Sequence, residues 1–373
     1  MDYSQILSQQ FNIKEEYAKN IITLLDDGNT IPFIARYRKE MHGSMDDQLI
    51  REFAEKLEYL RGLDKRRDEI RSLIDAQEKL TDEINLALDK AATLSELEDI
   101  YRPYRPKRKT RASIAKEKGL EPLANDILKQ EKGFDPSKSA VDYIDEEKGV
   151  TSVEDAIQGA MDIIAELVSD NAEIRKRIRN LTNANGVLVS VATDEEKDSV
   201  YKNYYDYKEP VKKIAGHRVL AVNRGEKEGF LKVSVETDSE KPLNSIFRAM
   251  ITDKNQLCSD IIREACTDAY QRLIYPSIER EVRNDLTDTA SENAMKVFAV
   301  NLKQLLMQPP VKGKTVLALD PGYRTGCKTA VVDSTGKVLD TTVIYPTHSD
   351  KKIQESKQTL LRLIKKHHVD IIS

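Results

Sequence analysis

The chain has 373 residues, of which 39% are hydrophobic and 33% are charged, and its formal net charge is −4 from 59 basic and 63 acidic residues. This length fits two or three ordinary domains, and apolar residues at helical spacing along most of it exclude a disordered chain. A net-acidic protein is not attracted to nucleic acid as a whole, so any such binding requires local basic patches.

Cysteine and histidine are too sparse and scattered to predict a metal centre or a disulfide framework. Cys258, Cys266 and Cys327 form no closely spaced pair, and none of the five histidines lies near a cysteine cluster. We therefore expect no structural zinc and no cofactor. Residues 1–8 lack the plan of a signal peptide, and no apolar stretch reaches membrane-spanning length. We expect a cytoplasmic protein without a membrane partner.

Residues 1–112 predict a helical N-terminal region. Apolar residues recur at helical spacing in Lys14–Asp27, and a long helix is expected to begin at Ser44 or Asp46. Residues 61–91 have the dense alternating charges of a solvated helix or a helical hairpin. Thr30 can cap a short helix between them.

This short helix combines apolar and basic side chains. Phe33, Ile34 and Tyr37 have the spacing of core residues and are expected to face inward. The basic residues, expected to face outward, are Arg36, Arg38 and Lys39. A recognition helix has this pattern, and so has any amphipathic surface helix, so both interpretations stay open.

Residues 101–111 predict an exposed basic loop, because they contain two prolines and no apolar run. Arginine and lysine neutralise phosphates, and tyrosine stacks on unpaired bases. The candidate binding residues are Tyr101, Arg102, Tyr104, Arg105, Lys107, Arg108, Lys109 and Arg111. In the alternative interpretation the segment packs down and its arginines pair with the nearby acids Glu96, Glu98 and Asp99; each interpretation can hold for different residues.

Residues 113–310 predict a central helical region with a small β insert. Val187–Val191 is expected to be a strand, and Arg218–Asn223 and Phe230–Val235 are expected to form a β-hairpin across two glycines. Helix returns over Asn255–Leu306 and ends before a pair of prolines.

Residues 311–373 change to an α/β pattern. The order is strand, strand, strand, helix and strand, which is typical of the opening of a ribonuclease-H-like domain. The expected elements are Thr315–Leu319, Lys328–Val332, Val338–Ile344, Asp350–His367 and Val369–Ile372. Because the chain stops inside the last strand, we expect a truncated domain.

Three stretches resemble the Tex family of bacterial transcription accessory proteins. They are residues 30–40 (TIPFIARYRKE), 97–109 (LEDIYRPYRPKRK) and 318–326 (ALDPGYRTG), and residues 217–229 are similar to a fourth family stretch. The resemblance implies a helical region with a helix-turn-helix-like part, followed by a YqgF-type domain of ribonuclease-H-like fold. In the family, helix-hairpin-helix segments and an OB-fold RNA-binding domain follow, and we expect this sequence to end before both.

Asp320 is the sharpest candidate for chemistry. It ends a predicted strand and precedes a loop with Gly322 and Gly326. Ribonuclease-H-like nucleases use such a carboxylate to hold two divalent ions, but one carboxylate is not enough. The resemblance also implies an inactive domain, so we expect Asp320 to be an inactive relic. The same spacing matches a phosphate loop of actin-like kinases, but no second phosphate loop accompanies it.

The expected fold is mainly α, with a multi-helical N-terminal region that includes a helix-turn-helix-like part and a small β-hairpin, followed by a truncated α/β ribonuclease-H-like domain. The expected function is a nucleic-acid-binding transcription accessory factor, a non-catalytic scaffold with little sequence specificity. The expected partners are single-stranded RNA or DNA, and RNA polymerase or its associated factors. The alternatives are a metal-dependent nuclease that uses Asp320 and a protein-docking module for the transcription machinery.

Overall fold

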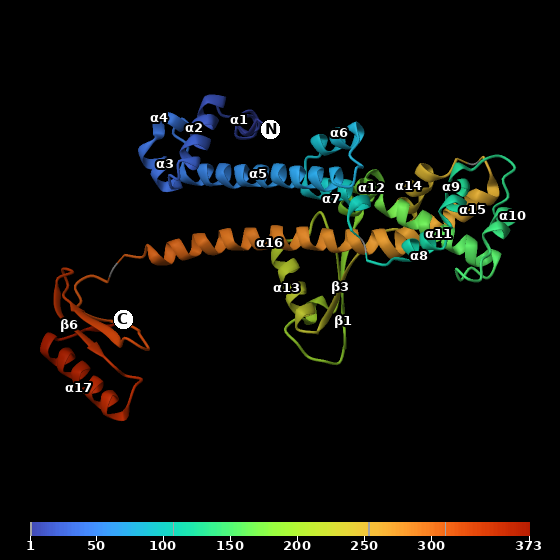
Figure 1. The fold of residues 1–373 in the computed structure, drawn as a ribbon. Helices are drawn as coiled ribbons and strands as arrows, with labels where there is room; N and C mark the ends of the chain where they lie inside the picture. Colours follow the sequence, from blue (N-terminus) through green and yellow to red (C-terminus); the bar gives the residue numbers. More distant parts are fainter. Residues whose placement is uncertain (1, 107, 253, 310) are drawn as a thin grey trace. The chain divides into compact units, whose positions relative to one another are not determined.

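The computed structural model describes residues 2–106, 108–252, 254–309 and 311–373. The described chain is mainly helical and ends in a smaller α/β part, as predicted (Figure 1). It divides into two compact units, Met1–Ala294 and Met295–Ser373. This division falls within a long helix, and the predicted domain boundaries after residues 112 and 310 stay predictions.

Four short helices pack on the first half of a long one at the start of the first unit. They are α1 (Tyr3–Phe11), α2 (Glu15–Asp26), α3 (Ile31–Tyr37) and α4 (Lys39–His42), and the long helix is α5 (Asp47–Asp75). Their shared core includes Leu7, Ile21, Ile34 and Phe53, all fully buried. The Asp46 side chain accepts a hydrogen bond from the Leu49 amide and so begins α5.

The second half of α5 carries a separate small core. Against it lie α6 (Asp82–Lys90) and α7 (Leu94–Tyr101), so the predicted charged segment forms a hairpin and not one continuous helix. A short 3-10 helix (Arg102–Tyr104) continues α7, and α8 (Arg111–Glu117) begins after residues 105–110.

The largest core of the first unit lies around α11 (Val153–Asp170). The helices that build it are α8, α9 (Glu121–Lys129), α10 (Pro136–Ala140), α12 (Ala172–Asn185), α14 (Glu240–Met250), α15 (Gln256–Asp268) and α16 (Tyr275–Leu306). A π-helical turn, Ala269–Ile274, joins α15 to α16. Cys258 and Cys266 are free and buried in this core, where they act as small apolar residues.

A three-stranded antiparallel sheet is inserted between α12 and α14. Its order is β2 (Asp206–Pro210), β1 (Val187–Ala192) and β3 (Leu231–Glu236). The predicted strand at 187–191 and the strand at 230–235 are confirmed to within one residue. The edge strand β2 is not predictable from sequence pattern, because it is polar and has no apolar alternation.

The predicted hairpin between residues 218–223 and 230–235 is wrong. Residues 218–223 lie in α13 (Gly216–Lys227). Val219, Val222 and Gly225 are its buried residues, and their spacing of three suits a helix that packs on β3. The β-branched side chains suggested a strand, and packing against the sheet outweighed that preference.

The second unit contains the predicted α/β succession. The strands β4 (Val316–Asp320), β5 (Cys327–Val332) and β6 (Val338–Ile344) precede α17 (Asp350–His367) and β7 (Ile371–Ile372). The sheet order is β6-β5-β4-β7, with β7 parallel to β4 and the other pairs antiparallel. Leu363 of α17 packs on the sheet. In the described part of the chain, no helix is both long and apolar enough to cross a membrane.

Candidate nucleic-acid interface

The first half of the predicted basic loop packs onto the helices. Tyr101 is only 6% exposed and belongs to the core beneath α7, with the Arg66 guanidinium 5.7 Å from its ring centre. Tyr104 is half-buried against the same core, and its carbonyl accepts a hydrogen bond from Gln77 Nε2 at 2.9 Å. For these tyrosines the packed alternative describes the structure.

Arg102 is also fixed by a contact with the helices, in this case with Asp170 of α11. Its Nε donates to Asp170 Oδ1 at 3.2 Å, and its side chain is one-third exposed. Burial, followed by the like charge of Arg175, lowers the pKa of the Arg102 guanidinium below its usual range. An arginine stays charged under these conditions, so Arg102 is a desolvated cation that anchors the loop.

The outer half of the loop presents its cations to solvent. Arg105, Arg108 and Arg111 are exposed and form no ion pair with any acid that the structure describes. Lys109 lies 3.4 Å from Glu117, and both side chains remain about two-thirds exposed. Lys107 lies outside the described residues. Thr110 and Ser113 form a capping box that begins α8 and ends the loop.

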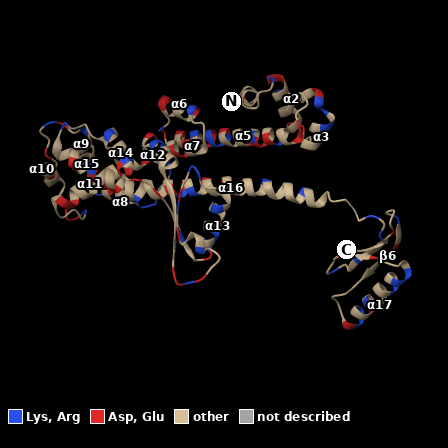
Figure 2. Ribbon diagram, turned by 180° about the vertical axis from the view of Figure 1, so that it is seen from behind, with Lys and Arg blue, Asp and Glu red and all other residues tan. Residues whose placement is uncertain are grey.

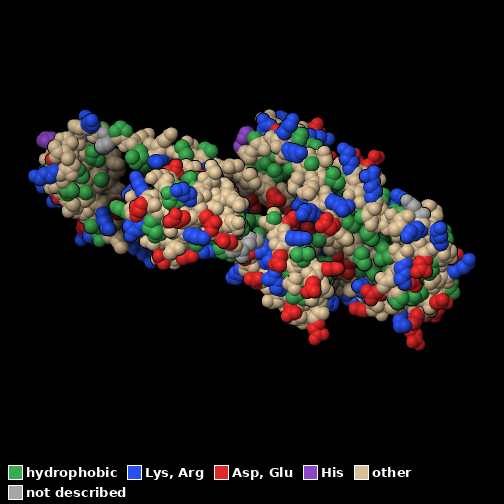
Figure 3. Space-filling view, turned by 90° about the horizontal axis from the view of Figure 1, so that it is seen from above, with side chains coloured by type: hydrophobic (Ala, Val, Ile, Leu, Met, Phe, Trp, Pro, Cys, Tyr) green, Lys and Arg blue, Asp and Glu red, His purple; other side chains and the backbone are tan. Residues whose placement is uncertain are grey.

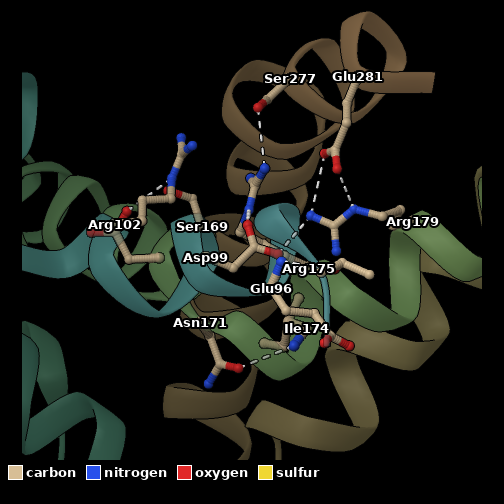
Figure 4. A network of polar contacts seen from close by, with 12 residues as sticks. Glu96, Asp99, Arg102, Ser169, Asn171, Ile174, Arg175, Arg179, Ser277 and Glu281 are labelled. Carbon is tan, nitrogen blue, oxygen red and sulfur yellow. Dashed lines mark hydrogen bonds and ion pairs between the residues drawn. The ribbon is translucent and has the colours of Figure 1, made fainter. Parts of the chain in front are cut away.

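A buried ionic network lies behind this loop (Figure 4). Asp99 of α7 accepts from Arg175 Nε and Arg179 Nη2 of α12, each at 2.5 Å. Arg179 Nε donates to Glu281 of α16 at 2.6 Å, and Arg175 Nη2 donates to Ser277 Oγ at 3.1 Å. The network therefore joins α7 to α12 and α16 and fixes the end of the helix from which the loop departs.

The expected pairing of loop arginines with Glu96, Glu98 and Asp99 does not occur among the described residues. Glu98 pairs with Arg66 of α5 at 2.7 Å. Glu96 pairs with Lys176 at 2.7 Å, and Asp99 is taken up by the arginines of α12. These acids pair with neighbouring helices, so they do not neutralise Arg105, Arg108 or Arg111.

A cavity of about 520 Å³ lies between the loop and the network. The loop contributes Arg102, Arg105 and Thr110 to its wall, and the network contributes Arg175 and Arg179. Asp99, Asp170 and Glu281 also line the cavity, so its inner charges are largely balanced. Arg105, at the rim, is the lining arginine without an ion pair in the described chain.

The second predicted basic segment, residues 36–39 at the end of α3 and the start of α4, lies at the protein surface. Ile34 is buried and Phe33 is half-buried, as expected. Arg36 and Lys39 are exposed and Arg38 is half-buried. The prediction that Tyr37 faces inward is wrong, because its side chain is 62% exposed. Only one turn of α3 reaches the core, and Tyr37 lies beyond it at the last position of the helix.

The helices differ in the charges that they carry. In the ribbon of Figure 2, acidic and basic residues are interspersed along α5, and α3 carries basic residues. On the face seen in Figure 3, Lys and Arg are mixed with Asp and Glu over much of the surface. Any attraction to phosphate is therefore local, as the net charge of −4 requires.

Asp320 lies at the exposed end of β4. The loop after it is tight, since a Cβ atom on Gly322 would lie 2.5 Å from the Gly326 carbonyl oxygen. In the chain as the structure describes it, no group of three or more His, Cys, Asp or Glu residues is placed to hold a metal ion. Among the described residues, Asp320 therefore belongs to no such group.

The fold is that of a multi-helical protein with a C-terminal α/β unit, and the first unit carries two exposed basic segments. Three family models match successive stretches of it. They are the Tex-like protein N-terminal domain over residues 1–75, the Tex central region over 131–298 and the Tex protein YqgF-like domain over 314–373. The chain belongs to the Tex family.

Curated relatives agree with the family models. The chain is 44% identical to "Uncharacterized protein YdcI" of Bacillus subtilis, with 100% of the chain and 53% of that protein covered. It is 38% identical to "Transcriptional accessory protein Tex" of Neisseria gonorrhoeae, covering 100% and 49%. It is 32% identical to the human "S1 RNA-binding domain-containing protein 1", covering 92% and 36%. The chain spans about half the length of the bacterial relatives.

Proposed function

We propose that this chain is a nucleic-acid-binding part of a transcription accessory protein and acts as a scaffold without catalytic turnover. The observation that carries the proposal is the outer basic loop, in which Arg105, Arg108 and Arg111 are exposed and form no ion pair in the described chain, next to a buried ionic network. The printed names of relatives, one a transcriptional accessory protein and one an RNA-binding domain protein, support it. The expected cytoplasmic location belongs to the same proposal.

The proposed contacts are electrostatic. The loop contributes Arg105, Lys107, Arg108, Lys109 and Arg111. The end of α3 and the start of α4 contribute Arg36, Arg38 and Lys39. Arginine and lysine on phosphate give affinity that falls with salt, and phosphate contacts carry little sequence information. Binding to RNA or DNA of many sequences follows from this chemistry.

A positioning role is proposed for Tyr101, Arg102 and Tyr104. The first is buried and the other two are half-buried, so they position the loop and do not stack on bases. In this proposal the contacts come from the exposed residues Arg105, Arg108, Lys109 and Arg111, together with Lys107.

A second candidate function, docking to RNA polymerase or its factors, is favoured by one observation. The end of α16 exposes large apolar side chains, and such surfaces often mark protein contacts. They include Met295, Val297, Phe298, Leu305 and Leu306, each more than half exposed. The two functions are compatible, because the basic loop and this part of α16 belong to different segments of the chain.

Binding of a labelled single-stranded RNA tests the main proposal. The test variant replaces Arg105, Lys107, Arg108 and Lys109 with alanine. A control variant removes four other exposed lysines, Lys19, Lys138, Lys148 and Lys202, each of which lies near an acid. Both variants change the net charge equally. We expect the loop variant to lose affinity at low salt and the control to retain it; equal loss in both would contradict a local site.

A further inference from the structure

The outer side of α3 presents an aromatic ring among cations. Tyr37 is 62% exposed, although the protein is only 6% aromatic and most of its large aromatic side chains are at least partly buried. Arg36 precedes it, and Arg38 and Lys39 follow it. An inward position of Tyr37, as predicted from the sequence, would not place an exposed ring among these cations.

One side of the Tyr37 ring packs against the ring of Phe33. Phe33 lies four residues earlier and so shares its helix face, and the two ring centres are 5.4 Å apart at an interplanar angle of 43°. The Arg38 guanidinium lies 5.0 Å from the Phe33 ring centre, and its Nη1 donates to the Tyr37 carbonyl at 2.9 Å. Phe33 thus supports Tyr37 from within, and the remainder of the Tyr37 ring is open.

The surrounding charge is positive. Arg36, Arg38 and Lys39 form no ion pair with an acid in the part of the chain that the structure describes. Glu40 is the one acidic residue among residues 31–42. By contrast, most arginines of the neighbouring α5 are paired, and Arg61 lies 2.7 Å from Asp26. Charge complementarity therefore favours an anionic partner at α3.

An open aromatic ring beside unpaired cations matches the chemistry of single-stranded nucleic acid. Each nucleotide offers a flat base to stack and a phosphate to neutralise. A duplex offers the same phosphates but buries its base faces in the stack, so the ring adds nothing to duplex binding.

We infer that the end of α3 and the start of α4 form a binding site for unpaired nucleotides, in which a base stacks on Tyr37 while adjacent phosphates contact Arg36 and Lys39. The inference rests on the proposed function and names its substrate class at this surface. Phe33 and Arg38 are positioning residues that hold the tyrosine ring.

The test compares a fluorescently labelled 12-nucleotide oligo(dT) strand with a duplex of the same length. The variants are Tyr37→Ala and Tyr37→Phe in the whole chain. Tyr59→Ala is the matched control, because Tyr59 is also exposed (44%) and has a cation, Lys56, 4.7 Å from its ring centre, but lies on α5. Circular dichroism melting checks that the exposed substitutions leave the fold intact.

Loss of one stacked base predicts a roughly 5- to 100-fold weaker affinity of Tyr37→Ala for the single strand. Tyr37→Phe keeps the ring and should bind within about twofold of the wild type, because stacking needs no hydroxyl. Duplex affinity should be the same for the wild type and Tyr37→Ala. Tyr59→Ala should match the wild type on both ligands.

Three outcomes would overturn the inference. Unchanged single-strand binding by Tyr37→Ala would do so while leaving the proposed function intact, provided that the wild type binds. Equal weakening on single strand and duplex would show that Tyr37 does not read unpaired bases. Unchanged nucleic-acid binding with lost binding to purified RNA polymerase would assign α3 to a protein partner. If the wild type binds no oligonucleotide, the proposed function itself fails.

Discussion

At the scale of single residues, Asp99 has the largest predicted effect on stability. It is buried and accepts from two arginines of α12, and Arg175 is only 3% exposed. Replacing Asp99 with alanine leaves those cations without their shared partner. Breaking a buried ion pair in this way costs about 3–5 kcal/mol. We expect Asp99→Ala to lower the free energy of unfolding by that amount in urea denaturation.

The control for this prediction is Asp89→Ala. Asp89 also pairs with an arginine, Arg71 at 2.7 Å, but its side chain is 62% exposed. Exposed pairs contribute about 0–1 kcal/mol. Similar losses for the two variants would show that burial of the Asp99 network does not matter to stability.

Asp340 provides a pH-dependent prediction in the second unit. Hydrogen bonds from Lys366 and then His367 lower the pKa of its carboxyl from 3.8 to about 2. Because the folded pKa is depressed, the stabilisation is present above pH 4 and is lost as pH falls toward 2. We expect the wild type to be more stable than Asp340→Asn at pH 5, and we expect most of this difference to be lost at pH 2. A stability difference that does not change between pH 5 and pH 2, measured by chemical denaturation, would contradict this.

The candidate site was only partly predictable from sequence at this scale. The density of Arg and Lys over residues 102–111 identified the loop, because charge runs are visible in one dimension. The Asp99–Arg175 pair joins residues 76 positions apart, and no local spacing encodes it. The exposure of Tyr37 was missed for a related reason, since an apolar residue at helical spacing usually marks a core face.

At the scale of elements, the packing of α13 on β3 predicts how a substitution of Gly225 changes the stability of the protein. A Cβ atom there would lie 2.5 Å from Leu231 Cδ1 and 2.9 Å from Leu231 Cγ. Alanine favours helix, but overpacking typically costs about 1–3 kcal/mol. We expect Gly225→Ala to destabilise the protein in urea denaturation.

Gly62→Ala is the matched control for that substitution. Gly62 lies within α5, and an added Cβ would meet nothing within 4 Å. Alanine should therefore stabilise this helix by about 0.5–1 kcal/mol. Opposite signs for the two substitutions are the expected result, and a stabilising Gly225→Ala would contradict the close packing of α13 on the sheet.

Elements with clear periodicity were predictable, and those decided by packing were not. The amphipathic pattern of residues 350–367 predicted α17 at its observed bounds. The β-branched residues at 218–223 suggested a strand because their propensity is local, whereas the buried face of α13 exists only once β3 lies beside it. The edge strand β2 has no apolar pattern of its own to detect.

At the scale of the whole molecule, the order of parts followed from the sequence. A helical majority and a final α/β unit were predicted from the change of pattern after the proline pair at 309–310 and from the family resemblance, and both are observed. The chain covers about half of its bacterial relatives' length. Linked binding modules raise each other's effective concentration, so we expect this chain to bind RNA more weakly than a full-length relative.

The most direct test of the central claim is the salt dependence of single-stranded RNA binding. Each phosphate contact on a single strand contributes about 0.7 to the slope of log K against log salt. We expect alanine at Arg105, Lys107, Arg108 and Lys109 to reduce the affinity and to reduce the slope by up to about 3. An unchanged slope in this variant, with wild-type affinity retained, would contradict the proposal that the outer basic loop contacts nucleic acid.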